Sequence, residues 1–250
     1  MYYMLQPSNR DWSFFHIIMT DNIKAVIFDA DDTLWLNEPL FRGAEQECFA
    51  VLSEYGSAQW LNEELYKTEM ENMEELGYGA KAFIMSMLET AYRVSDGKID
   101  ASRLMKLVEA GRRILRNPAT PLDGVRETLT RIKASGRYSM SILTKGELLD
   151  QNHKIDRSGL RGFFDFIDVV NEKTPEVYSE LCNRLDIKPE EMLMVGNSFR
   201  SDIDPVLKIG GKGVYIPSSM TWQHEKAEEY EHPGLIRAEK FPELLDILGV

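Results

Sequence analysis

Short apolar runs along the chain predict the strands of a parallel sheet. The run Ala25–Phe28 is apolar at every position, which is typical of a strand buried on both faces. Four similar runs follow later, at residues 138–143, 166–170, 192–195 and 213–216. Helical patterns separate these later runs, and Thr174 before Pro175 has the residue types of a helix start. This alternation of strand and helix predicts an α/β fold with a Rossmann-like open parallel sheet as its core.

The segment from residue 37 to 120 interrupts the alternation. It contains amphipathic helical patterns and no convincing strand pattern. The helical patterns cover residues 40–55, 59–76, 80–94 and 102–116. The breaks between them contain glycine, serine, asparagine or proline, which favour turns. We therefore predict that an all-helical domain, residues 37–120, is inserted into a core that consists of residues 21–36 and 121–250.

The first 20 residues follow neither pattern, because aromatic and polar side chains mix there without a period. We interpret residues 1–20 as an N-terminal extension. Alternatively, Met19 is the natural start, and residues 1–18 precede it. The apolar stretch at 14–19 lacks both the basic start and the small-residue cleavage site of a signal peptide.

Composition narrows the class of protein. The 250 residues are 43% hydrophobic and 10% aromatic, as expected for a chain with a sizeable globular core. A formal net charge of −12 and a sequence pI of about 4.9 disfavour binding to nucleic acid or to an anionic membrane. The separated cysteines Cys48 and Cys182 do not form a disulfide framework. No apolar run approaches the roughly 20 residues of a membrane span. We predict a cytoplasmic protein.

Two aspartates that directly follow the first predicted strand are candidates for chemistry. Asp29 and Asp31 are separated by one residue, so they lie on the same side if the chain stays extended. Ligands of open α/β sheets bind beyond the carboxyl ends of the strands, where this pair is expected. One carboxylate can attack phosphorus while its neighbour gives and takes a proton. The alternative is a solvated acidic loop without a function.

This acidic run is part of a set of four motifs that resembles the haloacid dehalogenase superfamily. The motifs are Phe-Asp-Ala-Asp-Asp-Thr-Leu-Trp at 28–35, Ile-Leu-Thr-Lys-Gly at 142–146, Asn-Glu-Lys-Thr-Pro-Glu-Val-Tyr at 171–178 and Met-Val-Gly-Asn-Ser-Phe-Arg-Ser-Asp at 194–202. Each motif is short, but all occur in the family's order and at predicted strand ends. The resemblance covers about residues 23–248, and it implies that the helical insert is a cap over the site.

The resemblance also implies roles for individual residues. Asp29 would be the nucleophile and a metal ligand. Asp31 would be the general acid and then the base, and its main-chain carbonyl would also bind the metal. Thr144 and Lys173 would hold the phosphoryl oxygens. The implied cofactor is Mg²⁺, which suits a site made of oxygen ligands. Taken alone, Thr144 could merely end a strand and Lys173 could be a surface lysine.

Asn197 departs from the family's pattern, in which an aspartate is usual at this position. An amide oxygen can still bind Mg²⁺ but carries no charge, so we expect weaker metal binding. Asp202 remains as a ligand, either directly or through water. Alternatively, Asn197 is only a turn residue. We interpret Ser198 as the cap of the following helix and Lys145 as a solvated lysine.

We therefore predict an enzyme, a phosphatase that hydrolyses a small-molecule phosphate monoester with Mg²⁺ through an aspartyl-phosphate on Asp29. The implied partner is a sugar phosphate or a nucleotide monophosphate. Two alternatives remain open: a phosphomutase with the same aspartate pair, and a weakened enzyme that binds a phosphoryl ligand or a protein partner. The dehalogenase branch is disfavoured, because it lacks an acid at the position of Asp31.

Overall fold

The computed structural model describes residues 20–218, 220, 222, 225 and 227–250, and the fold below is that of these residues. The predicted N-terminal extension and the predicted start at Met19 therefore lie outside the described residues, apart from Thr20. Thr20 is buried against the core, where its hydroxyl donates to the carbonyl of Ile247 over 2.9 Å.

A six-stranded parallel sheet in the order β3-β2-β1-β4-β5-β6 forms the centre of the core. The strands are β1 (Ala25–Phe28), β2 (Ser139–Lys145), β3 (Phe166–Val170), β4 (Met192–Gly196), β5 (Lys212–Tyr215) and β6 (Leu235–Arg237). The chain moves outward from β1 in both directions, so the topological switch point lies between β1 and β4. The predicted Rossmann-like open parallel sheet is confirmed. The edge strand β6 was not predicted.

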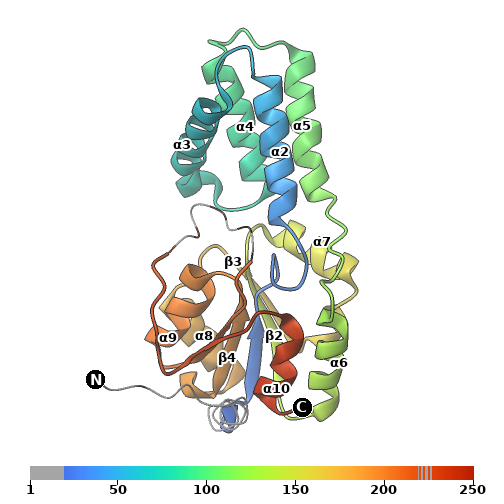
Figure 1. The fold of residues 1–250 in the computed structure, drawn as a ribbon, viewed down its shortest axis with the longest axis vertical. Coiled ribbons are helices and arrows are strands. Elements are labelled where there is room, and N and C mark those ends of the chain that lie inside the picture. Colours follow the sequence, from blue (N-terminus) through green and yellow to red (C-terminus); the bar gives the residue numbers. More distant parts are fainter. Residues whose placement is uncertain (1–19, 219, 221, 223–224, 226) are drawn as a thin grey trace, which may run out of the picture.

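Helices cover both faces of the sheet (Figure 1). One face packs against α6 (Val125–Ser135), α7 (Leu148–Ser158) and α10 (Leu244–Leu248), and the other against α8 (Pro175–Leu185) and α9 (Asp204–Lys208). Strand β1 supplies both cores, because successive side chains of a strand point to opposite faces. Val26 and Phe28 belong to the first core, and Ala25 and Ile27 to the second. The strand is therefore apolar at every position.

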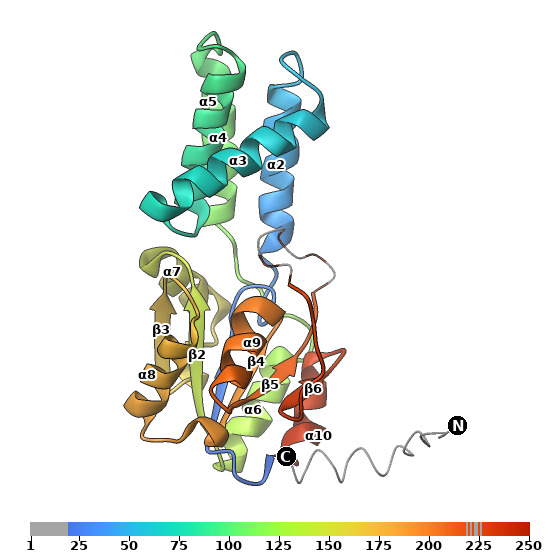
Figure 2. The ribbon, with the colours of Figure 1, turned by 90° about the vertical axis from the view of Figure 1, so that its left-hand side faces the viewer.

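Four helices between β1 and β2 form a separate unit with its own apolar core, which includes Cys48, Leu61 and Met87. They are α2 (Glu38–Val51), α3 (Ala58–Leu76), α4 (Ala80–Val94) and α5 (Ala101–Leu115). This four-helix unit stands beyond the end of the sheet toward which the strand arrows point (Figure 2). The first helix ends at Val51 rather than at residue 55, because residues 52–55 form a turn.

The two segments that join the four-helix unit to the core run side by side. The main-chain nitrogen of Leu122 donates to the carbonyl of Leu34 over 2.9 Å. The buried Asn117 amide donates to the carbonyl of Leu36 over 3.0 Å. In the part of the chain that the structure describes, no helix is both long and apolar enough to span a bilayer. The cytoplasmic location stays a prediction.

Candidate active site

A cavity of about 200 Å³ lies between the carboxyl ends of the strands and the four-helix unit. Its lining includes every residue that the sequence predicts for the site: Asp29, Asp31, Thr144, Lys173, Asn197 and Asp202. Asp29 follows β1, Thr144 lies in β2, Lys173 comes after β3, and Asn197 follows β4. Parallel strands present their carboxyl ends at one edge of the sheet, so residues far apart in the sequence meet there.

The carboxylate of Asp29 is buried and is bound on both oxygens. Oδ1 accepts a hydrogen bond from the Lys173 ammonium over 2.6 Å, and Oδ2 accepts one from the Thr33 hydroxyl over 3.0 Å. Burial raises the pKa of Asp29 to about 7, although the nearby Lys173 charge acts in the opposite direction. The two donors fix the orientation of the carboxylate at the floor of the cavity.

Lys173 is a buried bridge between two carboxylates. Its ammonium lies 2.6 Å from Asp29 Oδ1 and 2.7 Å from Asp202 Oδ1. Burial alone would lower the pKa of Lys173, but these carboxylates raise it above its usual value, so the side chain stays charged. Asp202 also accepts a hydrogen bond on Oδ2 from the main-chain nitrogen of Ser198 over 2.9 Å. Both oxygens of Asp202 are thus engaged by protein donors.

The carboxylate of Asp31 is held by three donors. Oδ1 accepts from the Trp35 indole over 2.8 Å. Oδ2 accepts from the Gln151 amide over 2.9 Å and from the Lys154 ammonium over 2.6 Å. Asp32 next to it has a φ of 61°, and its carboxylate accepts from the first main-chain nitrogens of the path into α2. This turn directs the chain from the site into the four-helix unit.

The side chain of Asn197 lies where a metal ligand is expected. One terminal atom of its amide is 3.0 Å from Thr33 Oγ1, 3.2 Å from Asp29 Oδ2 and 3.1 Å from the main-chain oxygen of Asp31. As nitrogen, this atom donates to Asp29 and to the Asp31 carbonyl. Rotation of the amide by half a turn places oxygen there instead, and three oxygens then converge. Such a set of oxygen donors fits a hard cation such as Mg²⁺.

This donor set is poor in carboxylates. Among the residues that the structure describes, no group of three or more His, Cys, Asp or Glu side chains is placed to hold a metal ion. A cation here would therefore depend on the carboxylate of Asp29, the main-chain oxygen of Asp31 and the amide of Asn197. The predicted role of Asp202 stays a prediction, since its oxygens contact Lys173 and Ser198.

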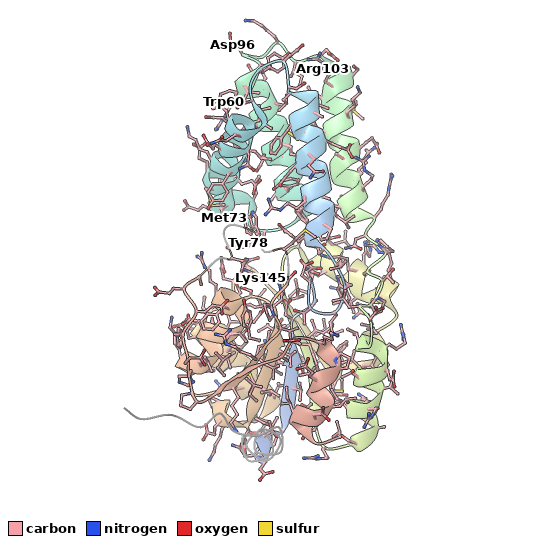
Figure 3. The ribbon with its side chains drawn as sticks, in the orientation of Figure 1. Trp60, Met73, Tyr78, Asp96, Arg103 and Lys145 are labelled. Atoms are coloured by element: carbon pink, nitrogen blue, oxygen red, sulfur yellow. The ribbon has the colours of Figure 1, made fainter. Side chains whose placement is uncertain are left out.

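Lys145 is not solvated, so its interpretation as a surface lysine was wrong. Its side chain is 14% exposed, and its ammonium lies 4.4 Å from the ring centre of Tyr78 in the turn between α3 and α4. Figure 3 labels both residues at the boundary between the core and the four-helix unit. Lys145 also contacts Glu225 and donates to Ser201 over 2.9 Å. The position beside Thr144 in a buried strand end was the signal for this placement.

The structure adds residues that the sequence analysis did not place in the site. They are Thr33, Trp35, Gln151, Lys154, Lys145 and Glu225. Ser198, by contrast, does cap the turn that follows it, because its hydroxyl accepts from the main-chain nitrogen of Ser201 over 3.1 Å. The clearest unused signal was on α7, where Gln151 and Lys154 are three residues apart and share one helix face.

Comparison with known proteins identifies the class. The model of the haloacid dehalogenase-like hydrolase family matches residues 23–210, and the chain belongs to this family. The chain is similar to a haloacid dehalogenase-like family hydrolase from Xanthomonas campestris, whose crystal structure superimposes with a TM-score of 0.80. The two sequences are 37% identical, and the match covers 91% of this chain and 92% of the other. The predictions of the superfamily and of an enzyme are confirmed.

Curated relatives are named phosphatases. The glyceraldehyde 3-phosphate phosphatase of Methanothermobacter thermautotrophicus is 27% identical over 80% of this chain and 88% of its own length. The enzyme of the same name from Methanopyrus kandleri is 26% identical over 90% of this chain and 97% of its own length. The similarity therefore extends over most of each protein.

Proposed function

We propose that this chain is a Mg²⁺-dependent phosphatase that hydrolyses phosphate monoesters of small metabolites through an aspartyl-phosphate on Asp29. One observation carries the proposal: Asp29, Asp31, Lys173 and the oxygen cluster at Asn197 line one cavity at the switch point of the sheet. The phosphatase names of the relatives support the reaction class. Their substrate makes a triose phosphate or another small sugar phosphate the first class to test.

The chain's own residues account for most of the reaction. Asp29 attacks phosphorus while Lys173 and Thr33 hold its carboxylate in place. Asp31 gives a proton to the leaving oxygen, and then takes one from the water that hydrolyses the aspartyl-phosphate. Thr144, at the end of β2, is the proposed hydroxyl donor to the phosphoryl oxygens. Because phosphoryl transfer depends mainly on positioning and charge neutralisation, these fixed donors suit it.

The proposed metal ligands are Asp29, the main-chain carbonyl of Asp31 and Asn197, with Asp202 as a further candidate. When bound, Mg²⁺ would offset the repulsion between the Asp29 carboxylate and the negatively charged phosphate. Lys173 reduces the same repulsion without a metal. Its ammonium, which lies between the carboxylates of Asp29 and Asp202, offsets part of the negative charge on Asp29.

We also propose that the four-helix unit is a cap that limits access to the cavity. Its side of the cavity includes Phe83 and Tyr78. Tyr78 reaches the core directly, since its hydroxyl donates to Glu172 and its ring faces Lys145. A cover of this kind excludes water from the reacting groups and selects the ester that enters.

The test is phosphate release from a panel of phosphorylated metabolites, with and without Mg²⁺. We expect Asp29→Asn to abolish release and to remain folded, whereas Asp96→Asn should behave as the wild type. Asp96 is a suitable control, because its side chain is 90% exposed at the far end of the four-helix unit (Figure 3). Brief reaction with a labelled substrate, followed by an acid quench, should leave label on the peptide that contains Asp29. Undiminished turnover by Asp29→Asn would refute the mechanism.

A further inference from the structure

We propose that Lys154 and Gln151 are positioning residues for Asp31, and that they leave Oδ1 of Asp31 as the atom that exchanges protons with the substrate. This inference rests on the proposed function, in which Asp31 is the general acid and base. It comes from the unusual polarity of α7 and from the number of hydrogen bonds on each oxygen of Asp31.

Helix α7 turns polar side chains inward and leucines outward. Its buried residues are Asp150, Gln151, Lys154, Ile155 and Ser158. Leu148 and Leu149, in its first turn, are 65% and 54% exposed. The hydrophobic effect alone would favour the opposite orientation, and a buried lysine is costly unless it is paired. The inward polar face therefore serves groups on the core, and the structure identifies the carboxylate of Asp31 as its target.

Lys154 is 3% exposed and lines the cavity. Its ammonium lies 2.6 Å from Asp31 Oδ2 and 3.5 Å from Asp150 Oδ2 one helical turn earlier. The shorter contact is to Asp31, which belongs to a distant part of the sequence. A partner on the same helix was available, so the need for charge pairing within α7 does not explain the contact with Asp31.

Gln151 also contacts Oδ2 of Asp31, and the glycine at position 146 leaves room for its side chain. Its amide nitrogen donates to Asp31 Oδ2 over 2.9 Å and to the carbonyl of Lys145 over 2.6 Å. A Cβ atom on Gly146 would lie 2.9 Å from this nitrogen, and Gly146 has a φ of 133°. Glycine at this position thus leaves room for the amide. The turn after β2 and the first turn of α7 are shaped so that Gln151 can reach Asp31.

The hydrogen bonds on Asp31 are unequal between its two oxygens. Each carboxylate oxygen offers two lone-pair positions. Among the residues that the structure describes, Oδ2 accepts from both Gln151 and Lys154, whereas Oδ1 accepts from the Trp35 indole alone. Oδ2 is therefore filled, and only Oδ1 has a position for a proton or for the oxygen of a substrate. Lys154 and Gln151 hold Oδ2 in place, which leaves Oδ1 as the oxygen of Asp31 that can exchange a proton in the cavity that Asp31 lines.

Oδ1 of Asp31 gives up a proton in the first step of the reaction and regains one in the second. In the first, a bond forms between Asp29 and phosphorus, the bond from phosphorus to the ester oxygen breaks, and Oδ1–H gives its proton to that oxygen. In the second, water attacks phosphorus, its proton passes to Oδ1, and the bond to Asp29 breaks. The products are an alcohol and inorganic phosphate, and both aspartates return to their starting states.

The experiment compares two aryl esters that differ in how much the leaving oxygen needs a proton. The probes are p-nitrophenyl phosphate, with a good leaving group, and phenyl phosphate, with a poorer one. We expect Lys154→Met to lower kcat/KM for phenyl phosphate by about 100-fold, the lower end of what a positioned acid contributes. For p-nitrophenyl phosphate, the loss should be at most about 3-fold, because its leaving group needs little protonation. The parameter kcat/KM covers the steps up to the aspartyl-phosphate, in which Asp31 acts as the acid.

Two further variants and a control keep the test decisive. Lys154→Arg should restore much of the phenyl phosphate activity, and Gln151→Leu should show the same selectivity as Lys154→Met to a smaller extent. Lys133→Met is the matched control, because Lys133 pairs with Asp165 on the surface, away from the cavity. If Lys154→Met does not fold, the Gln151→Leu and Lys154→Arg variants decide.

Equal losses for both esters, or no loss, would overturn the positioning role while the proposed function stands. A failure of the proposed function is a different result, since the wild type would then release phosphate neither from these esters nor from any member of the metabolite panel. That outcome would refute both.

Discussion

Replacement of Asn197 by aspartate tests which charges stabilise the site and whether Asn197 is a metal ligand. The amide position lies 3.2 Å from Asp29 Oδ2, so a second carboxylate there adds a repulsion of about 5 kcal/mol at an effective dielectric constant of about 20. Protonation relieves this repulsion, and it is easiest at Asp29, because burial already raises the pKa of Asp29 to about 7. Protonating Asp29 costs about 1 kcal/mol at pH 7.5 but about 3 kcal/mol at pH 9, where holding a new carboxyl of ordinary pKa about 3.9 in its neutral form costs about 7 kcal/mol.

At pH 9 and without metal, the Asn197→Asp variant should therefore melt at a temperature lower by roughly 6–12 °C. With Mg²⁺, the cation takes the place of the amide donors and the added charge strengthens its binding, so the variant should gain more thermal stability than the wild type. The assay is thermal unfolding across a Mg²⁺ titration, supported by calorimetric titration of the metal.

Asn183→Asp on the exposed surface of α8 is the matched control and should leave both quantities unchanged. Equal Mg²⁺-dependent shifts in the wild type and the Asn197→Asp variant would mean that Asn197 is not a metal ligand. An unchanged melting temperature without metal would refute the electrostatic argument.

Two predictions concern other charges. Lys173→Met leaves the carboxylates of Asp29 and Asp202 buried without their cation. We expect the free energy of unfolding, measured with urea at pH 7.5, to fall by about 3–5 kcal/mol, and to fall less at pH 5. The variant should show no turnover. Burial raises the pKa of Glu38 to about 7 and of Glu69 to about 8. The folded state therefore keeps protons that the unfolded state loses, so stability should fall as pH rises from about 5 to 8. Glu69→Gln should flatten this fall, and an unchanged pH profile of the unfolding midpoint would contradict it.

The sheet could be predicted from the sequence because its strands are buried on both faces. Runs such as Ala25–Phe28 have no polar position, and this leaves little choice of structure. Strand β6 could not be predicted in the same way. It has three residues, Leu235–Arg237, and one of them is exposed, so no run of apolar residues marks it. It forms because β5 offers an open edge with which its main chain can pair.

Asp29 and Asp31 could be predicted as site residues from their place directly after the first strand. Lys173 and Asp202 could be predicted because their motifs resemble those of the haloacid dehalogenase superfamily. Lys154 and Lys145 were not predicted as part of the site, although Lys154 shares a helix face with Gln151 and Lys145 lies beside Thr144 at a strand end. A single lysine on a helix or strand is most often solvated, and the partners that bury these two come from distant segments. Exposed leucines beside buried polar residues on α7 are visible only once the face of the helix is known.

The charges around position 197 explain the effect of an uncharged asparagine there. The structure pairs the carboxylates of Asp29, Asp31 and Asp202 with the ammonium groups of Lys154 and Lys173. An aspartate at 197 would add a further negative charge before a phosphate arrives. The amide instead donates to Asp29 and to the carbonyl of Asp31, which a cation would otherwise hold together. These donors keep the carboxylate of Asp29 oriented without a metal. If Asn197 is a metal ligand, as proposed, its uncharged amide binds Mg²⁺ more weakly than an aspartate, so turnover should depend on Mg²⁺ over a higher concentration range than the Asn197→Asp variant requires.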